Sequence, residues 1–378
     1  MYECHECALK VNIPLLTEGQ KAQCPRCGFI LLAKHNNAIE RVLAFSITAL
    51  IFLLASLPFD FLSFKANGLE NKFDIAASFN ILIDNHYEIL ALLEFVTIFA
   101  IPIIILLSLI HLLIPLRKGI YPKKGHRVLK LIFNLIPWSM VEIFLIGALV
   151  SLIKILGMAD IHLGLSFYAF TLFSVAMTAA LLHLDKQYIT QLLDKVKNNP
   201  HGHSTIQCHS ISNKRIRIQQ TWALIITSVV LYIPANLLPI MNTRLLGQDE
   251  PSTILGGVVL LWSMGSYPIA LVIFIASVAV PVAKILILAW LNYSVQTQRK
   301  NLTLERMKLY RLAEFVGRWS MVDVFVVIIL ASLIQLGNTM SIYPGAATLA
   351  FSGVVIITML AAMSFDSHLI WNTSKPYD

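Results

Sequence analysis

Two acidic residues stand inside apolar segments that are long enough to cross a lipid bilayer. Glu142 lies in the sequence WSMVEIF (138–144), and Asp323 lies in its near copy, WSMVDVF (319–325). Charged side chains are costly inside a membrane, so such residues are functional candidates by default. The pattern predicts a duplicated membrane unit with one carboxylate at the same depth in each copy, as in transporters built from repeats.

The second copy carries further polar residues in apolar surroundings. Lys284 lies deep in its segment, and we expect it to pair with Asp323 inside the membrane. Arg318 and Ser320 precede Asp323 on the same predicted helix, and Thr358 is expected to join this polar network. The alternatives are a purely structural ion pair, a lysine that reaches the membrane surface, and a threonine bonded to its own helix. No lysine occupies the matching place in the first copy.

Asn236 is a further candidate for this network. It lies between Pro234 and Pro239, which should kink or unwind the end of its helix and free carbonyl groups to line a cavity. An ordinary helix end explains the pattern equally well. Gly256 and Gly257 are interpreted in the same way, as a bend where the chain re-enters the membrane.

Four cysteines near the N-terminus have the spacing of a metal site. The pairs Cys4/Cys7 and Cys24/Cys27 form two C-x-x-C motifs separated by 16 residues. Such pairs predict one structural zinc ion held by four thiolates, with no open coordination position for catalysis. So short a segment would depend on the metal for its stability. Disulfides are the alternative, but they are disfavoured on the reducing cytoplasmic side.

A second cluster of metal-binding residue types occurs in the central loop, at His201, His203, Cys208 and His209. We interpret it as a degenerate second ribbon that is solvated linker rather than a metal site, because it lacks the knuckle spacing.

The composition places the whole chain in a membrane. Of 378 residues, 57% are hydrophobic and only 13% are charged, whereas soluble domains carry roughly a quarter charged residues. Segments of about 20 apolar residues predict spanning helices. Eight are expected, at about 41–63, 88–116, 130–157, 161–184, 219–242, 257–294, 314–337 and 343–365. The second and the sixth are longer than one crossing needs. Either both helices tilt, or the sixth begins with a short re-entrant piece near Trp262.

The basic residues give the orientation. The net charge is +8, and most of the 29 lysines and arginines fall in the N-terminal tail and in alternate loops. By the positive-inside rule both termini are cytoplasmic, and the first apolar helix acts as an uncleaved anchor. The basic charge therefore reports topology and attraction to anionic lipid, and no nucleic-acid partner is expected.

Several phrases of the second half, among them YIPANLLP (232–239) and GRWSMVDVF (317–325), together resemble the paraquat-inducible protein A family. The resemblance is specific between Trp222 and Trp371 and weaker between Ala38 and Asp185. It implies an inner-membrane protein of double-membraned bacteria that handles lipids with an oligomeric periplasmic tunnel of MCE domains. The first copy lacks the Tyr-x-Pro-Ala-Asn motif, which places the transport chemistry in the second.

We therefore expect an all-α polytopic membrane protein with two tandem four-helix units. The predicted parts are a cytoplasmic zinc ribbon (1–37), a first unit (38–185), a linker with the degenerate ribbon (186–218) and a second unit (219–372). The expected function is lipid loading or extraction, and the hypothesis for its mechanism couples protonation at Asp323, paired with Lys284, to the opening of a lipid-sized cavity in the second unit. A non-transporting anchor or gate for the tunnel, and a stress or redox sensor using the ribbon, are the alternatives. No motif of an enzyme site is present.

Overall fold

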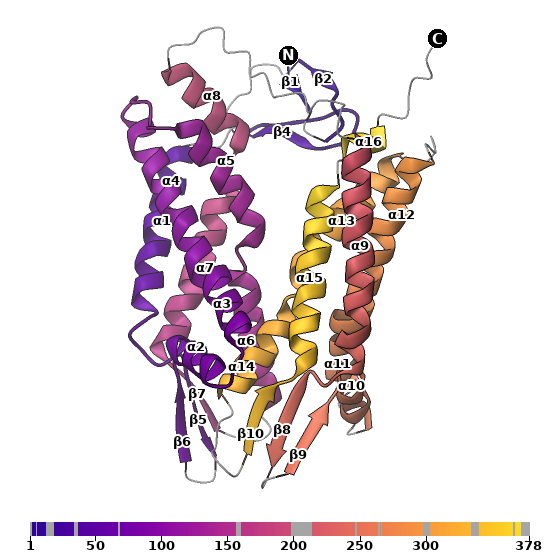
Figure 1. Ribbon diagram of the computed structural model, residues 1–378. Helices are drawn as coiled ribbons and strands as arrows, with labels where there is room; N and C mark the ends of the chain where they lie inside the picture. Colours follow the sequence, from indigo (N-terminus) through magenta and orange to yellow (C-terminus); the bar gives the residue numbers. More distant parts are fainter. Residues whose placement is uncertain are drawn as a thin grey trace. The chain divides into compact units, whose positions relative to one another are not determined.

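The computed structural model describes residues 2–4, 6–12, 19–33, 37–66, 69–155, 160–197, 214–245, 248–263, 265, 267–297, 303–333, 340–365 and 367–371. The chain is mostly helical (Figure 1). Eight described helices or helix pairs are long and apolar enough to cross a membrane: Ala38–Ala55, Glu88–Arg117, Gly125–Leu152, Leu165–Leu182, Ile216–Leu237, Ile275–Gln296, Thr303–Ser332 and Ala346–Ser364. The predicted number of spanning segments and the class of multi-pass membrane protein are confirmed.

The first half of the chain follows a defined order of elements. It begins with four short ribbon strands: β1 (Tyr2–Glu3), β2 (Lys10–Val11), β3 (Lys21–Gln23) and β4 (Ile30–Ala33). The next elements are α1 (Ala38–Ala55), β5 (Leu62–Ala66), β6 (Leu69–Phe73), α2 (Ile75–Asp84), α3 (Glu88–Phe95) and a π-helical turn η1 (Val96–Ala100). They are followed by α4 (Ile101–Arg117), α5 (Gly125–Leu135), η2 (Ile136–Trp138), α6 (Val141–Ile155), β7 (Asp160–Leu163), α7 (Leu165–Leu182) and α8 (Lys186–Val196).

The second half repeats this order closely. Its elements are α9 (Lys214–Leu237), β8 (Met241–Leu245), β9 (Gln248–Ser252), α10 (Ile254–Ser263), α11 (Tyr267–Phe274), a second π-helical turn η4 (Ile275–Ala279), α12 (Val280–Gln296), α13 (Thr303–Trp319), α14 (Val322–Leu333), β10 (Met340–Pro344), α15 (Ala346–Ser364) and α16 (His368–Trp371). A strand hairpin, a short helix and a π turn thus occur at matching places in both halves.

The prediction of an all-α protein missed two three-stranded antiparallel sheets. Their strand orders are β6-β5-β7 and β9-β8-β10, so each sheet joins a hairpin to one later strand. The register pairs Phe64 with Ile161 in the first sheet and Thr243 with Ile342 in the second. The predicted spans 41–63, 161–184, 219–242 and 343–365 therefore extend into strands, because a short apolar run does not by itself distinguish a strand from a helix.

Each three-stranded sheet is followed by a tight corner into the next helix, and each corner contains one glycine. A Cβ on Gly164 would lie 1.8 Å from the carbonyl oxygen of Asp60, and one on Gly345 would lie 2.1 Å from that of Pro239. Both backbones can approach so closely only because glycine has no side chain. The second corner is completed by Thr348, whose hydroxyl donates to the carbonyl of Ile240 at 2.6 Å.

Helix breaks differ from the prediction in the second half. α10 ends before Gly265, so the predicted sixth segment is a short helix packed on a longer one, and the predicted break near Trp262 lies at the end of α10. The bend predicted at Gly256 and Gly257 is wrong, because both lie within α10. α9 continues through Pro234 and ends at Leu237.

Proline explains the two π turns. Pro102 and Pro281 each occupy the second position of the helix that follows a π turn. A proline within a helix lacks the N–H donor and clashes with the carbonyl four residues earlier. The wider π turn relieves that clash, and such turns occur often at functional sites.

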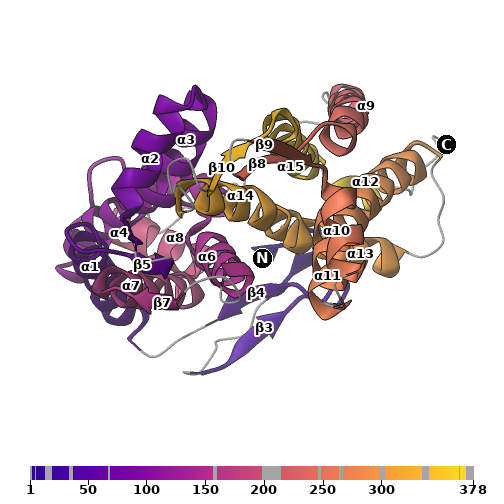
Figure 2. The same ribbon diagram turned by 90° about the horizontal axis from the view of Figure 1, so that it is seen from below.

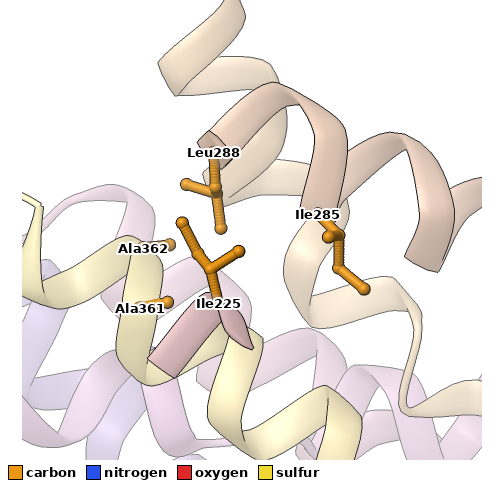
Figure 3. Close-up of a cluster of buried hydrophobic side chains, with 5 residues drawn as sticks. All are labelled: Ile225, Ile285, Leu288, Ala361 and Ala362. Atoms are coloured by element: carbon orange, nitrogen blue, oxygen red, sulfur yellow. The ribbon is translucent and has the colours of Figure 1, made fainter. Parts of the chain in front are cut away.

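Contacts divide the chain into two compact units. The first contains residues 1–59, 96–141 and 165–211, and the second contains residues 60–95, 142–164 and 212–378. These boundaries differ from the predicted four-helix units, because two pieces of the first half group with the second. The core of the second unit includes Ile225, Ile285, Leu288, Ala361 and Ala362, which α9, α12 and α15 bring together (Figure 3).

Candidate functional site

The four predicted metal ligands converge in the first unit. Cys4, Cys7, Cys24 and Cys27 are all buried and their sulfur atoms lie within 4.8 Å of one another. Each pair sits on a tight turn, in which the backbone N–H four residues after the first cysteine donates to the carbonyl of that cysteine: Ala8 donates to Cys4 and Gly28 donates to Cys24. The hairpins β1–β2 and β3–β4 bring the two turns together.

The cluster has the dimensions of a tetrahedral metal site. Sγ of Cys4 lies 3.5 Å from that of Cys27, and Sγ of Cys7 lies 3.5 Å from that of Cys24. Zinc–sulfur bonds of about 2.3 Å imply sulfur–sulfur edges of about 3.8 Å. All four cysteines are free thiols, so the disulfide alternative is not formed. The residues therefore fit one metal ion with four thiolate ligands.

Backbone hydrogen bonds prepare one of these thiols for a metal. Burial raises the pKa of Cys24, but hydrogen bonds from the backbone groups of Cys27 and Arg26, together with those of the Cys7 and Cys27 thiols, lower it to about 7. Burial raises the pKa of Cys27 to about 11. Only the thiolate is a metal ligand, so binding of the ion must displace protons from the cluster. The predicted cluster at residues 201–209 lies outside the described residues.

Lys284 is a buried charged residue of the second unit. It lies on α12 with a 2% exposed side chain, and its Nζ has no hydrogen-bond partner in the part of the chain that the structure describes. The amine lies over the last turn of α13, where a Cβ on Gly317 would be 2.7 Å from Nζ. The expected direct bond between Lys284 and Asp323 is therefore not formed.

The residues predicted around Asp323 are divided between two helices. α13 ends at Trp319, and Asp323 lies half-buried in the first turn of α14, so Arg318 and Asp323 do not share the predicted continuous helix. Ser320, buried at the break, donates to the carbonyl of Gly317 at 3.0 Å, next to the amine of Lys284. The side chain of Arg318 lies outside the described ones.

Thr358 is buried on α15, and its hydroxyl donates to the carbonyl of Val355 at 3.0 Å. This is the hydrogen bond to the residue's own helix that threonine commonly makes. The structure places Thr358 in the helix bundle that holds Lys284, and its role in a network stays a prediction.

Glu142 differs from its counterpart in the second copy. Its side chain is exposed in the first turn of α6, whereas Asp323 is half-buried. The helices that carry them nevertheless pack together within the second unit. The rings of Phe144 and Phe325, which occupy the same place in the two copies of the repeat, meet edge to face at 5.8 Å. Gly147 lets α6 approach, since its Cβ would be 3.1 Å from Cβ of Phe325.

The Tyr-x-Pro-Ala-Asn motif is connected to a π turn. Asn236 donates to the carbonyl of Tyr232 at 2.9 Å, and the hydroxyl of Tyr232 lies 3.4 Å from the carbonyl of Val278 in η4. The amide of Asn236 therefore bonds within its own helix, and Tyr232 makes the contact to the irregular backbone.

Sequence reasoning missed a buried acid in the first half. Glu94 and Ser78 are each 0% exposed, and the Ser78 hydroxyl lies 2.8 Å from both carboxyl oxygens of Glu94. Ser277, buried in η4, was also missed as a candidate. The signal for Glu94 was present, because it is an acid inside an apolar run that continues through Pro102.

Comparison with known proteins decides the family. The family model described as paraquat-inducible protein A matches residues 39–193 and 218–375. The chain belongs to the paraquat-inducible protein A family. The resemblance noted in the sequence is thus confirmed, and the matched segments lie on both sides of the central loop. No solved structure matches the chain.

Relatives in this family carry transport names. The intermembrane transport protein PqiA of Escherichia coli (strain K12) is 37% identical, over 98% of this chain and 95% of its own length. A probable intermembrane transport protein of Haemophilus influenzae is 28% identical, over 100% and 96%. The lipophilic envelope-spanning tunnel protein A of Escherichia coli (strain K12) is 27% identical, over 98% and 91%.

Proposed function

We propose that this chain acts in intermembrane transport, as the inner-membrane component that loads or extracts lipid for a periplasmic tunnel of MCE domains. The names of its relatives support transport between membranes and an envelope-spanning tunnel. Both termini would be cytoplasmic, as the basic loops favour. In this proposal the chain is a transporter rather than an enzyme.

The observation that carries the proposal is the buried amine of Lys284. A lysine in the apolar interior of a spanning helix lowers stability, so its presence indicates a use. Gly317 leaves room for the amine, and Ser320 places a hydroxyl at the same turn. We propose that protonation changes at Lys284 and Asp323 are coupled to the opening of a lipid-sized cavity in the second half. The pair would meet only in another state of the cycle.

We also propose that the two halves are tandem four-helix units of one ancestral repeat. The matching order of elements and the contact between Phe144 and Phe325 support it. For the cysteine cluster we propose a structural zinc ion. Cys4, Cys7, Cys24 and Cys27 would hold it, and its role would be to fold the N-terminal hairpins.

The test compares Lys284→Met with wild type. Methionine fills a similar volume without charge, so the variant should be more stable by about 1–4 kcal/mol while lipid transfer between the two membranes falls to background. Thermal unfolding of purified protein and labelled-phospholipid transfer in cells measure the two effects. Lys123→Met, at an exposed site, is the matched control.

Unchanged lipid transfer in Lys284→Met and in Asp323→Asn, with normal protein levels, would reject the coupling. It would favour the alternative of a non-transporting anchor, for which removal of the β5–β6 or β8–β9 hairpin should abolish function instead. A sensor that uses the ribbon would lose signalling in Cys24→Ser and keep lipid transfer.

A further inference from the structure

A second buried ionisable site lies in the first half of the chain. Glu94 is near the end of α3, inside the apolar helix that runs from Glu88 to Arg117, and its side chain is 0% exposed. Ser78 on α2 approaches both carboxyl oxygens at 2.8 Å. The helices α2 and α3 form a hairpin, with its two arms side by side in Figure 2.

The pairing of a carboxyl with a hydroxyl suits a group that gains and loses a proton. A hydroxyl donates to a carboxylate and accepts from a carboxylic acid. Ser78 can therefore keep its hydrogen bond to Glu94 in either protonation state by turning its own O–H. Ionisable residues within spanning helices mark proton relays and ion pathways.

The position of Glu94 relates it to the site in the second half. Glu94 lies just before the π turn η1, and Lys284 lies just after the π turn η4. The sequences FVTIFAIP (95–102) and FIASVAVP (274–281) align these turns. In that alignment isoleucines replace the ionisable residues in the opposite copies, as Ile273 and Ile105. Each half thus has one ionisable group at its π turn, an acid in the first and a base in the second.

The hairpin also contacts elements of the second half. α2 packs on α14, whose first turn holds Asp323. Tyr87, at the turn between α2 and α3, donates a hydrogen bond to the carbonyl of Pro344 at the end of β10. The other described acids of these helices are Asp84 and Glu88, and both are exposed. Glu94 therefore belongs to a hairpin that packs directly against α14, the helix that carries Asp323.

We propose that Glu94 and Ser78 form a second proton-binding site, which acts on the second half through the α2–α3 hairpin. The proposal deepens the proposed function and depends on it only for the consequence in transport. Proton binding itself can be measured without any lipid or partner.

The test is infrared difference spectroscopy of the full chain in lipid vesicles between acidic and alkaline pH. Glu94→Gln should remove a carbonyl stretching band of a protonated carboxyl, because glutamine keeps the shape and does not titrate. Ser78→Ala keeps Glu94 and should shift the same band, because one hydrogen bond is lost. Glu88→Gln, an exposed acid on the same helix, is the matched control and should leave the band unchanged.

A spectrum of Glu94→Gln identical to that of wild type would overturn the proposal, and an unshifted band in Ser78→Ala would remove Ser78 from the site. If Glu94→Gln does not fold, the shift in Ser78→Ala decides, because it reports on the native carboxyl. If Glu94→Gln loses the band but Lys284→Met keeps normal lipid transfer, the proton site stands and the proposed coupling at Lys284 is overturned. If Glu94→Gln keeps the band but Lys284→Met loses lipid transfer, the coupling at Lys284 stands and the proton site is overturned.

Discussion

Lys284 and Glu94 show two ways in which a buried ionisable side chain is accommodated beside a helix. Lys284 places its amine over α13 at the only kind of residue that offers enough space, Gly317, and Ser320 bonds the carbonyl of that glycine. Glu94 is treated differently, because Ser78 supplies a direct hydrogen bond. The Lys284 amine fits because Gly317 has no side chain, whereas the Glu94 carboxyl receives a hydrogen bond from the Ser78 hydroxyl.

A methyl group at position 317 tests whether the place of the amine matters. Gly317→Ala puts Cβ 2.7 Å from Nζ of Lys284, but the end of a flexible side chain can move. Stability should change by no more than about 1 kcal/mol, since alanine is also the better helix former, while lipid transfer should fall. Gly353→Ala, whose Cβ would be 3.4 Å from Leu231, is the control for transfer and thermal unfolding. Normal transfer in Gly317→Ala would mean that the position of the amine is immaterial.

At the scale of elements, tight corners join the last strand of each sheet, β7 or β10, to the helix that follows it. At each corner a glycine admits a carbonyl that no side chain could tolerate. A hydroxyl of the next helix adds a hydrogen bond: Ser166 donates to the carbonyls of Ser56 and Phe59 in the first half, and Thr348 donates to that of Ile240 in the second. A close glycine contact and a hydroxyl bond thus occur at both corners, with different acceptors.

Closing the space at a corner should destabilise the protein. Gly345→Ala would place Cβ 2.1 Å from a backbone oxygen, which cannot move without disturbing β8 and α15. We expect a loss of at least about 2 kcal/mol, as for severe overpacking. Gly257→Ala meets nothing within 4 Å in α10 and should gain about 0.8–1 kcal/mol from helix propensity. Thermal unfolding in detergent compares the two, and equal melting temperatures would contradict this account.

The N-terminal hairpins should depend on the metal. Elemental analysis should find one zinc ion per chain in wild type and none in Cys24→Ser. Cys208→Ser, which leaves both C-x-x-C motifs intact, is the control and should keep the full zinc content. Because the ligands must be thiolates, acidification should release the ion, and a chelator should unfold the hairpins while helical content in the rest of the chain is kept. Full zinc content in Cys24→Ser would exclude the four-thiolate site.

At the scale of the molecule, the two halves are not two independent bundles. Contacts group residues 60–95 and 142–164 of the first half with the second half. Phe144 meets Phe325, and Tyr87 bonds the carbonyl of Pro344. Elements of the first half therefore pack directly on elements of the second half.

The orientation in the membrane can be tested by labelling. Lys123 and Glu250 are both exposed, the first between α4 and α5 and the second on β9. A cysteine introduced at Lys123 should react with an impermeant reagent only after the inner membrane is opened, because basic loops stay cytoplasmic. One introduced at Glu250 should react in spheroplasts. The same reactivity at both positions would contradict an odd number of crossings between them.

Features of the fold could be predicted where a pattern within a short stretch of the sequence is specific for them. Eight spanning segments followed from hydropathy, since the cost of placing backbone and charge in lipid is summed along about 20 consecutive residues. The cysteine cluster followed from its spacing, because two tight turns on hairpins leave few other arrangements. The strands at the ends of the spans did not follow, because Phe61 and Leu62 are as apolar as the helix before them.

The sequence by itself thus determined the membrane class, the family and the cluster of four cysteines, because apolar runs, family phrases and C-x-x-C pairs are each patterns of residues close together in the chain. Only the tertiary structure decided which polar groups meet. Rotation of each helix about its axis buries Glu94 against Ser78, exposes Glu142, and sets Lys284 over Gly317 instead of against Asp323. That rotation is fixed by packing between helices, where lipid and protein are equally apolar and small residues set the approach.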